Sequence, residues 1–448
     1  MDRNMGSHME SMNGASWGPP DRRPGDSPRI TAVERFHVRV PFDRAVARWN
    51  SINNSQWELL EIVRVRTEDP EVVGYGEALS TYPDFCTTPR AMEAVCGRLP
   101  IEDAADDRLG LSLQMALYDA AGQAYGVPLH RLFGRPQVRD RTPLAWWNTK
   151  MPAELLGQEA ARSVEAGYLA QKIKARPWFD VREQLAAIDR STPPEFRVDI
   201  DWNSMLLDAG HALPVLIEIA GMPKIGLFES PIRRSDAAGQ RRIHDAVPIL
   251  LAEHFDPTLF PVWIRDDSVD AYVISPPGVT SMVNRAAAAD LLHKDVFLQI
   301  CGTGITTAFT AALNAVLPAA RLPAVTVMNT YSDDLIVSPL RVTGGHVEVP
   351  TRPGLGVLVD EDALEQFRVD DEFVVPVPRR LLTVDYGDGR HRNFVSAEQL
   401  WEDFTELTTM PVQPPHASLT LLDDDGSADF TSLHARANRH PQWLDVRG

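Results

Sequence analysis

Short apolar segments recur at a nearly constant spacing through the middle of this 448-residue chain. They are rich in β-branched residues and alternate with amphipathic stretches, and landmark residues near their ends lie 21 to 28 positions apart. Most are too apolar for strands with one face in water, which is typical of parallel sheets covered on both faces. We interpret them as eight strands: Pro143–Trp147, Gln171–Ala175, Phe196–Trp202, Gly226–Ser230, Pro248–Glu253, Ala271–Ser275, Val296–Cys301 and Ala324–Asn329.

Eight such strands joined by helices predict a closed parallel β/α barrel. An open doubly wound sheet is the alternative, and it is disfavoured because no glycine-rich phosphate turn follows the first strand. Ahead of the barrel, strands at Ile30–Phe42 and Trp57–Val65 and an amphipathic helix at Asp106–Gly122 predict a separate α+β domain. The barrel helices are expected at Glu154–Glu165, Ala209–Ala220, Ser281–Leu292 and Thr306–Leu317.

The two ends of the chain differ from its middle. Residues 1–28 contain Gly6-Ser7-His8-Met9 and several prolines, are similar to an expression tag, and are left out of the predicted fold. The last part is Pro-rich and acidic but retains apolar residues such as Trp401, so we expect it to pack on the main body. We place the α+β domain at 29–140, the barrel at 141–340, a return to the first domain at 341–370 and a C-terminal extension at 371–448.

Composition excludes several classes of function. The chain has 44 Lys+Arg against 62 Asp+Glu, a net charge of −18, which argues against a nucleic-acid partner. No uncharged apolar run approaches the roughly 18 residues of a membrane span. Three scattered cysteines, Cys86, Cys96 and Cys301, are too few for a disulfide framework, so a reducing, cytoplasmic location is expected.

Charged residues gather where four consecutive strands are expected to end. Active groups of β/α barrels lie at the carboxyl ends of strands, and residues two apart share a face, so these side chains are expected to converge. Convergent carboxylates repel one another unless a cation neutralises them, and an all-oxygen ligand set favours magnesium over zinc. The residues concerned are Lys172 and Lys174, Asp201 and Asn203, Glu229, and Glu253.

A lysine beside such a cation in a dry pocket has a lowered pKa and can act as a base near neutral pH. The pattern therefore predicts removal of the α-proton of a small-molecule carboxylate, giving an enediolate that the cation stabilises. Each of these residues taken alone is more often a cap or a surface charge. It is the combination on four successive strand ends that indicates an active site.

These residues resemble the enolase superfamily, in its mandelate racemase and muconate lactonizing enzyme branch. The resemblance implies a capping domain over a modified (β/α)7β barrel, one Mg²⁺ held by Asp201, Glu229 and Glu253, and a homo-oligomer. It also implies Lys174 as the proton-abstracting base, with Lys172 beside it. The resemblance covers about residues 29–370 and includes the segments Gly74–Glu77, Met115–Gly122, Lys172–Lys174, Asp201–Asn203, Phe228–Pro231 and Pro353–Val357.

The same resemblance implies where the substrate binds. Asn203 lies beside the predicted metal, and Asn329 ends the eighth strand where racemase-like members have Glu. The capping loops, which choose the substrate in such enzymes, contain Arg44, Arg48, Trp49 and Tyr82.

Departures from the family pattern favour one reaction. Racemase-like members carry an Asp on the sixth strand and a His on the seventh, and lactonizing relatives carry a Lys on the sixth. Here these strands end in Ile274-Ser275 and Ile300-Cys301, so none of the three residues is present. Racemisation needs bases on both faces of the α-carbon, whereas elimination can use one. We therefore expect dehydration of an acid-sugar-like hydroxy-carboxylate, with Lys172 or His254 protonating the departing hydroxide. His254 is adjacent to Glu253, so on a regular strand it is expected to point away from the pocket. The alternative functions are an isomerase (cycloisomerase, epimerase or racemase) and a non-catalytic relative.

Overall fold

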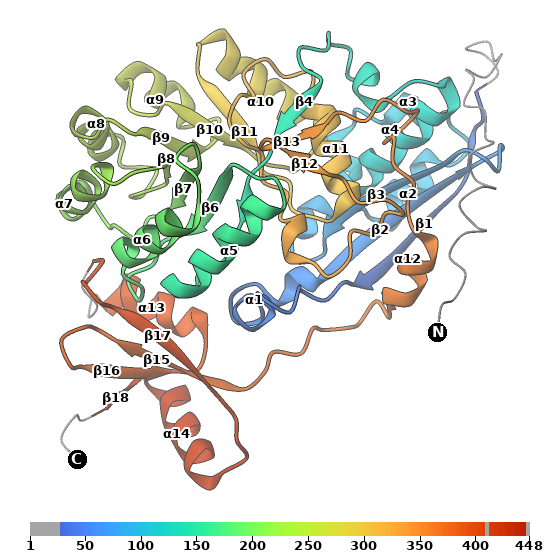
Figure 1. The fold of residues 1–448 in the computed structure, drawn as a ribbon. Coiled ribbons are helices and arrows are strands. Elements are labelled where there is room, and N and C mark those ends of the chain that lie inside the picture. Colours follow the sequence, from blue (N-terminus) through green and yellow to red (C-terminus); the bar gives the residue numbers. More distant parts are fainter. Residues whose placement is uncertain (1–26, 408–411, 445–448) are drawn as a thin grey trace, which may run out of the picture.

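A parallel sheet curled into a barrel is the centre of the computed structural model, which describes residues 27–407 and 412–444 (Figure 1). Its seven strands are hydrogen-bonded in the order β11-β10-β9-β8-β7-β6-β5, so neighbours in sequence are neighbours in space. The strands are β5 (Trp146–Trp147), β6 (Ala170–Lys174), β7 (Arg197–Asp201), β8 (Ile225–Glu229), β9 (Leu250–His254), β10 (Ala271–Ile274) and β11 (Asp295–Leu298).

Two isolated bridges close the barrel in place of a full eighth strand. Val325 pairs with Gln299 beyond β11, and Ala324 pairs with Leu144 ahead of β5. The predicted strand Ala324–Asn329 is therefore too long, because the chain turns into a short 3-10 helix, η6 (Met328–Thr330).

Helices cover the outside of the barrel, and three of them begin at an aspartate that caps the helix. The side chains of Asp180, Asp208 and Asp236 accept hydrogen bonds from the first free N–H groups of α6, α7 and α8. No helix in the described ranges is long and apolar enough to cross a membrane. The helices are α5 (Ala153–Glu165), α6 (Val181–Ser191), α7 (Ala209–Ala220), α8 (Ala237–Ala246), α9 (Phe260–Asp266), α10 (Val279–Leu291) and α11 (Gly304–Asn314).

An antiparallel sheet in the order β14-β1-β2-β3 lies beside the barrel and carries helix α4 (Leu111–Tyr125) on one face. The predicted helix Asp106–Gly122 begins later than expected, and it is buried almost all round rather than amphipathic. Gly74 and Gly76 permit this close packing, because a Cβ atom at either position would lie 2.0 Å from a backbone oxygen of α4. The strands are β1 (Ile30–Arg39), β2 (Leu59–Thr67), β3 (Val73–Leu79) and β14 (Arg368–Val369).

Glu77 of β3 joins this sheet to the barrel. Its fully buried carboxyl group accepts hydrogen bonds from the backbone N–H groups of Thr303 and Thr306 and from the Thr303 hydroxyl, at 2.6 to 2.9 Å. These donors belong to the first turn of α11, whose N–H groups have no partner within the helix. The arrangement of Gly74, Gly76 and Glu77 in sequence therefore has a structural role at this domain boundary.

Smaller elements complete this part of the chain. A three-stranded sheet with the order β12-β13-β4 lies at the barrel. The elements are α1 (Ala47–Asn53), η2 (Ser55–Glu58), η3 (Pro83–Phe85), α2 (Pro89–Val95), α3 (Pro100–Asp103), η4 (Asp107–Leu109), η5 (Leu129–Phe133), β4 (Arg141–Pro143), β12 (Val342–Thr343), β13 (His346–Glu348) and α12 (Glu361–Phe367).

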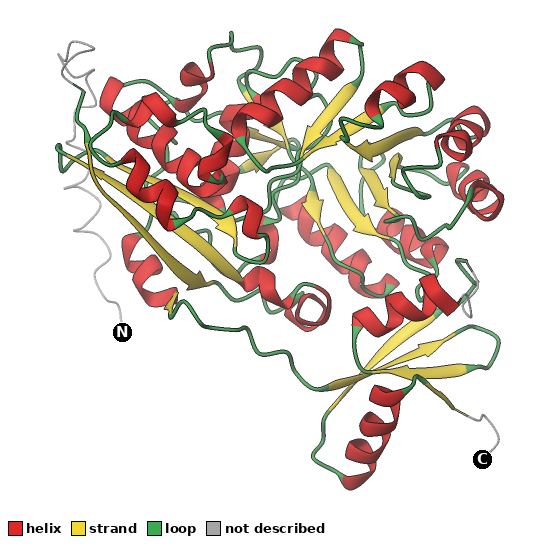
Figure 2. Ribbon diagram, turned by 180° about the vertical axis from the view of Figure 1, so that it is seen from behind, coloured by secondary structure: helices red, strands yellow, loops and turns green. Residues whose placement is uncertain are grey.

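The C-terminal extension forms its own antiparallel sheet, in the order β17-β15-β16-β18, with a helix on each side (Figure 2). Its apolar residues share one core cluster with Trp178 and Phe179, which follow β6, and with Met205, which follows β7. The extension therefore packs against loops at the carboxyl ends of the barrel strands. Its elements are β15 (Arg380–Asp385), β16 (His391–Phe394), α13 (Ala397–Leu407), β17 (Ser418–Asp423), α14 (Ala428–Arg439) and β18 (Gln442–Leu444).

Of the tag-like segment 1–28, all but residues 27 and 28 lies outside the described residues.

Candidate active site

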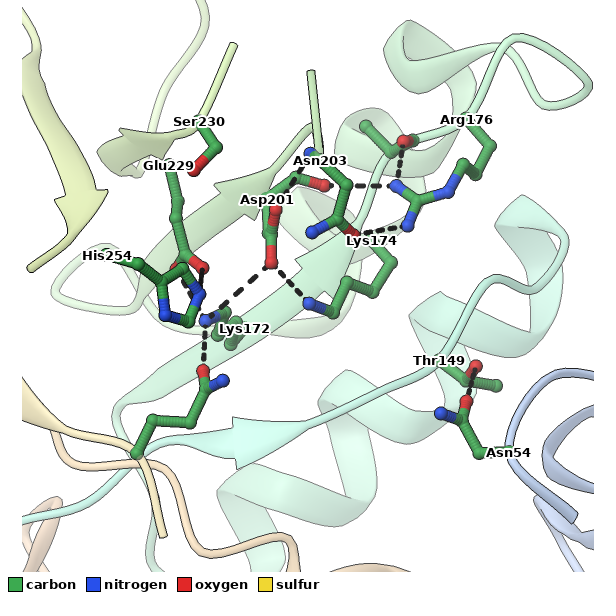
Figure 3. A network of polar contacts seen from close by, with 12 residues as sticks. Asn54, Thr149, Lys172, Lys174, Arg176, Asp201, Asn203, Glu229, Ser230 and His254 are labelled. Carbon is green, nitrogen blue, oxygen red and sulfur yellow. Dashed lines mark hydrogen bonds and ion pairs between the residues drawn. The ribbon is translucent and has the colours of Figure 1, made fainter. Parts of the chain in front are cut away.

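Three charged residues lie side by side at the ends of adjacent barrel strands. In the register of the sheet, Lys174 on β6 pairs with Asp201 on β7, and Asp201 pairs with Glu229 on β8. Residues paired in a parallel sheet point to the same face, so the three side chains converge at one end of the barrel (Figure 3). Asp201 and Glu229 are completely buried there.

Both predicted lysines contact these carboxylates. Lys172 Nζ lies 2.5 Å from Glu229 Oε2, 3.9 Å from Asp201 Oδ2 and 2.6 Å from Gln299 Oε1. Lys174 Nζ donates to Asp201 Oδ2. The structure thus brings together four residues that the sequence places on three separate strands.

The two lysines have pKa values displaced in opposite directions. Burial opposes charge on both, but Glu229 and Asp201 outweigh it at Lys172 and raise the pKa of that ammonium group. Burial dominates at Lys174, with the positive charge of Lys172 adding to it, so the pKa of Lys174 is lowered despite Asp201. Opposite pKa shifts in two neighbouring groups indicate that one of them acts as the acid and the other as the base. Lys174 is the member suited to accept a proton, and Lys172 stays a cation.

His254 faces the pocket, contrary to the expectation that Glu253 takes the inward position on this strand. Glu229 pairs with Ala252, so alternation along β9 places Ala252 and His254 on the inner face. The Nε2 atom of His254 lies 3.3 Å from Glu229 Oε1, and its side chain is 26% exposed. A histidine that faces a pocket can serve as a general acid or base.

Glu253 does not join the other two carboxylates. Its Oε2 atom accepts a hydrogen bond from Ser230 Oγ at 2.7 Å, and its Oε1 atom accepts one from Gln240 Nε2 at 2.8 Å. Gln240 lies on α8, outside the barrel. Burial raises the pKa of the Glu253 carboxyl to about 8. That Glu253 is a third metal ligand stays a prediction: Glu229 and Asp201 are close enough for their charges to act on it, but both of its oxygens accept hydrogen bonds from Ser230 and Gln240.

Asp201 and Glu229 nevertheless fit a divalent cation. Two charged partners approach the oxygens of Glu229 within the described structure, Lys172 at 2.5 Å and His254 at 3.3 Å. Burial of two such carboxylates is costly without a cation between them. The oxygen donors of Asp201 and Glu229 suit magnesium.

Arg176 was missed by the sequence interpretation and supports this site. Its guanidinium group is buried and donates to the backbone oxygens of Ala175, at 2.6 Å, and Asp201, at 3.3 Å. It also donates to Asn203 Oδ1, while the backbone N–H of Asn203 donates to Asp201 Oδ1 at 2.9 Å. The predicted substrate residue Asn203 is thus held between Arg176 and Asp201. The signal was available, since Arg176 continues the two-residue alternation of Lys172 and Lys174.

Asn329 and Trp49 occupy positions other than those expected. The Asn329 amide exchanges two hydrogen bonds with the backbone of Trp147, at 2.9 and 3.1 Å, and so completes the barrel closure like a strand residue. Trp49 on α1 packs edge-on against Phe179, with ring centroids 5.8 Å apart, in the core shared with the C-terminal extension. The substrate roles predicted for both are not supported by these contacts.

Tyr82 lines a cavity of about 260 Å³ at the barrel mouth. Opposite it the cavity is bordered by residues from β9 and from the ends of the sixth and seventh barrel strands. His254 is the only histidine among the residues that line this described cavity. The residues on that side are His254, Ser275, Pro276, Gln299, Ile300 and Cys301.

Comparison with known proteins gives consistent matches. The family profile "Enolase C-terminal domain-like" matches residues 156–363. The chain is 26% identical to D-gluconate dehydratase of Thermoproteus tenax, over 75% of this chain and 76% of that protein. It is also 26% identical to D-galactarolactone cycloisomerase of Agrobacterium fabrum, over 77% of this chain and 100% of that protein.

A solved structure has the same fold. It is an enolase from Pseudomonas fluorescens with bound magnesium, potassium and tartrate, at a TM-score of 0.63 and 19% identity. The match covers 76% of this chain and 92% of that one.

Proposed function

Because the chain belongs to the mandelate racemase and muconate lactonizing enzyme branch of the enolase superfamily, we propose that it is a magnesium-dependent dehydratase of a small hydroxy-carboxylate. The observation that carries the proposal is the one-sided distribution of bases. Lys174, with its lowered pKa, contacts Asp201 at the end of β6, whereas the cavity wall at the ends of the sixth and seventh barrel strands offers Ser275, Gln299 and Cys301.

Asp201 and Glu229 are the residues that would hold the cation. When bound, magnesium supplies a positive charge that stabilises the negative charge developing on the substrate carboxylate. Lys172 adds a second positive charge next to these carboxylates and remains protonated, so it can bind a substrate carboxylate oxygen.

The proton transfers are assigned to two side chains of this protein. Lys174 Nζ takes the α-proton, and the electron pair of the broken C–H bond forms the enediolate. The β C–O bond then breaks, and the hydroxide leaves as water with a proton from His254, which faces the same pocket. The resulting enol becomes a 2-keto acid. Elimination of this kind needs no base on the far wall.

Isomerisation is the second candidate. The cycloisomerase relative is matched over its whole length at the same identity as the dehydratase relative. A cycloisomerase would use Lys172 and Lys174 with an acid on the opposite side, for which Cys301 and Tyr82 are the groups present in the cavity.

A screen in deuterium oxide separates the two candidates. Sugar acids of five and six carbons are incubated with the protein and MgCl₂, and mass spectrometry records both water loss and deuterium gain. The proposal expects a product lighter by one water, and no reaction after chelation of the metal. Deuterium in an isomer that retains all its oxygens would support isomerisation, and no exchange into any acid would contradict both reactions.

A further inference from the structure

The cavity of about 260 Å³ at the barrel mouth has two chemically different sets of lining residues. The barrel contributes four side chains with polar atoms, together with Pro276 and Ile300. The capping domain contributes a set that is apolar except for the Tyr82 hydroxyl and the indole N–H of Trp57. We call this second set the cap lining, and it consists of Trp57, Ala78, Leu79, Tyr82, Phe85 and Leu111.

The polar barrel residues of this cavity adjoin the candidate active site. His254 Nε2 lies 3.3 Å from Glu229 Oε1, and Gln299 Oε1 accepts a hydrogen bond from Lys172 Nζ at 2.6 Å. The Cys301 thiol is close enough to the two lysines for their charges to act on it. A molecule whose carboxylate is held by Lys172 therefore has this cavity directly beside it.

The cap lining is held in place by packing. The Trp57 ring lies 5.3 Å from that of Trp147 on β5, and the Tyr82 ring lies 5.1 Å from that of Phe85, measured between ring centroids. Leu111 begins helix α4 and is buried. The lining is thus a preformed surface, with three aromatic side chains among its six residues.

The two polar atoms of the cap lining leave little for a ligand to bind. The Trp57 side chain lies close enough to the Tyr82 hydroxyl to form a hydrogen bond with it. A ligand hydroxyl pressed against the rest of this lining would leave water without gaining a partner, which is unfavourable. Apolar carbon placed there gains the free energy of leaving water.

The size of the cavity also suits an apolar group. A dry apolar cavity of about 150 Å³ is large enough to bind benzene. The cavity described here measures about 260 Å³ and is therefore large enough for an aromatic ring or a short alkyl chain. Aromatic side chains such as Trp57 and Phe85 contact a ring favourably in edge-to-face or offset arrangements.

We propose that the cap lining binds an apolar group, alkyl or aryl, carried on the β-carbon of a 2,3-dihydroxycarboxylate substrate. The inference rests on the proposed function, which it deepens by naming the substrate class. The α C–H bond and the β C–O bond break, the α-proton goes to Lys174 Nζ, and the hydroxide leaves as water with a proton from His254. The enol that remains becomes a 2-keto acid with an apolar tail. Sugar acids then react more slowly, because their distal hydroxyls face the cap lining.

The test compares acids that differ only beyond the β-carbon. The D and L forms of gluconate and mannonate together present all four configurations at C2 and C3. Each is paired with the 2,3-dihydroxyhexanoate of the same arrangement at these two carbons, which lacks the three distal hydroxyls. The stereoisomers of 2,3-dihydroxy-3-phenylpropanoate form the aryl arm. Mass spectrometry of water loss, with MgCl₂, gives kcat/KM, and calorimetry gives Kd for acids that are not turned over.

Three variants of the full chain locate the preference. Phe85→Asn places a polar group in the cap lining, whereas Phe85→Leu keeps it apolar. Phe367→Asn is the matched control, because Phe367 is also half-buried on the same core cluster but lies on α12 and does not line the cavity. We expect the full chain to prefer an apolar acid at least about tenfold over its hexonate, because a single methylene in an apolar pocket can have an effect of that size. Phe85→Asn should lose most of this preference, and the other two variants should keep it.

Failure of this inference is distinguishable from failure of the proposed function. If a hexonate reacts or binds as well as its apolar counterpart, the apolar subsite is refuted, and water loss from the hexonate still supports a dehydratase. Full preference in Phe85→Asn, or an equal loss of it in Phe367→Asn, would also refute the subsite. If the apolar acids bind with the expected preference but none loses water or exchanges its α-proton, the dehydratase is refuted and the subsite stands. If no acid binds or reacts, both are refuted.

Discussion

The Trp401 ring lies 5.5 Å from the guanidinium carbon of Arg176, so a residue of the C-terminal extension contacts one that holds the strand end bearing Asp201. Such a cation–π contact contributes about 1–2 kcal/mol when it is largely desolvated. We expect Trp401→Ala to lower kcat/KM about 5- to 30-fold by loosening Arg176, while Trp401→Phe retains most of the activity. Steady-state kinetics on the acid identified by the screen checks this.

Thermal unfolding of the same two variants provides the control. Trp401 is 38% exposed, so both substitutions are expected to change Tm little. Wild-type kinetics in Trp401→Ala would show that the extension does not act on the catalytic strands.

Glu77 gives a prediction about stability. Glu77→Ala leaves two buried backbone N–H groups at the start of α11 without a partner, which costs about 2–4 kcal/mol. Glu77→Gln keeps an acceptor for both N–H groups, so it is expected to be the milder change. Urea unfolding of both variants measures the difference, and equal stability of the two would contradict the capping role of this side chain.

Lys150 gives a prediction about the pH dependence of stability. Burial, reinforced by the positive charges of Arg176 and Lys174, lowers its pKa in the folded protein. The unfolded chain therefore binds more protons there, and the stability contribution of Lys150 rises with pH toward 10. Lys150→Met removes this penalty and is expected to raise Tm at pH 7 by about 1 °C, a gain on the order of 1 kcal/mol. The gain should shrink as pH rises. A Tm difference that is constant between pH 7 and pH 10 would show that Lys150 is not an unfavourable buried cation.

Metal binding is expected to depend on Asp201 and Glu229. Asp201→Asn and Glu229→Gln each remove a charged oxygen ligand and should weaken Mg²⁺ binding, measured by calorimetry, at least tenfold. Asp199→Asn is the matched control, because Asp199 lies two residues earlier on the same strand face and, although the charge of Glu229 acts on it, no hydrogen bond or ion pair joins it to Asp201 or Glu229 in the described structure. Equal loss in all three variants would point to a general effect of charge in the barrel.

The barrel was predictable because each of its strands is buried on both faces and leaves a run of apolar residues. The way in which the barrel closes was not predictable. The segment Ala324–Asn329 has a strand-like composition, but only Ala324 and Val325 pair with neighbours, and the side chain of Asn329 takes over the contacts with Trp147. A side-chain amide that replaces the backbone hydrogen bonds between two strands leaves no periodic pattern in the sequence.

The direction of Glu253 and His254 also depended on information absent from the sequence. Adjacent residues on a strand point to opposite faces, so one step in the register between β8 and β9 decides which of them enters the pocket. Glu229 pairs with Ala252, and this places His254 inward.

The central claim is that Lys174 removes the α-proton of the substrate at a site held by Asp201 and Glu229. The most direct test follows hydrogen exchange at the α-carbon in deuterium oxide by NMR, with MgCl₂, for the full chain and for Lys174→Ala. A positioned base contributes about 10²- to 10⁴-fold to the rate, so Lys174→Ala should lose both exchange and water elimination by that factor. Exchange at the original rate in Lys174→Ala would contradict the account.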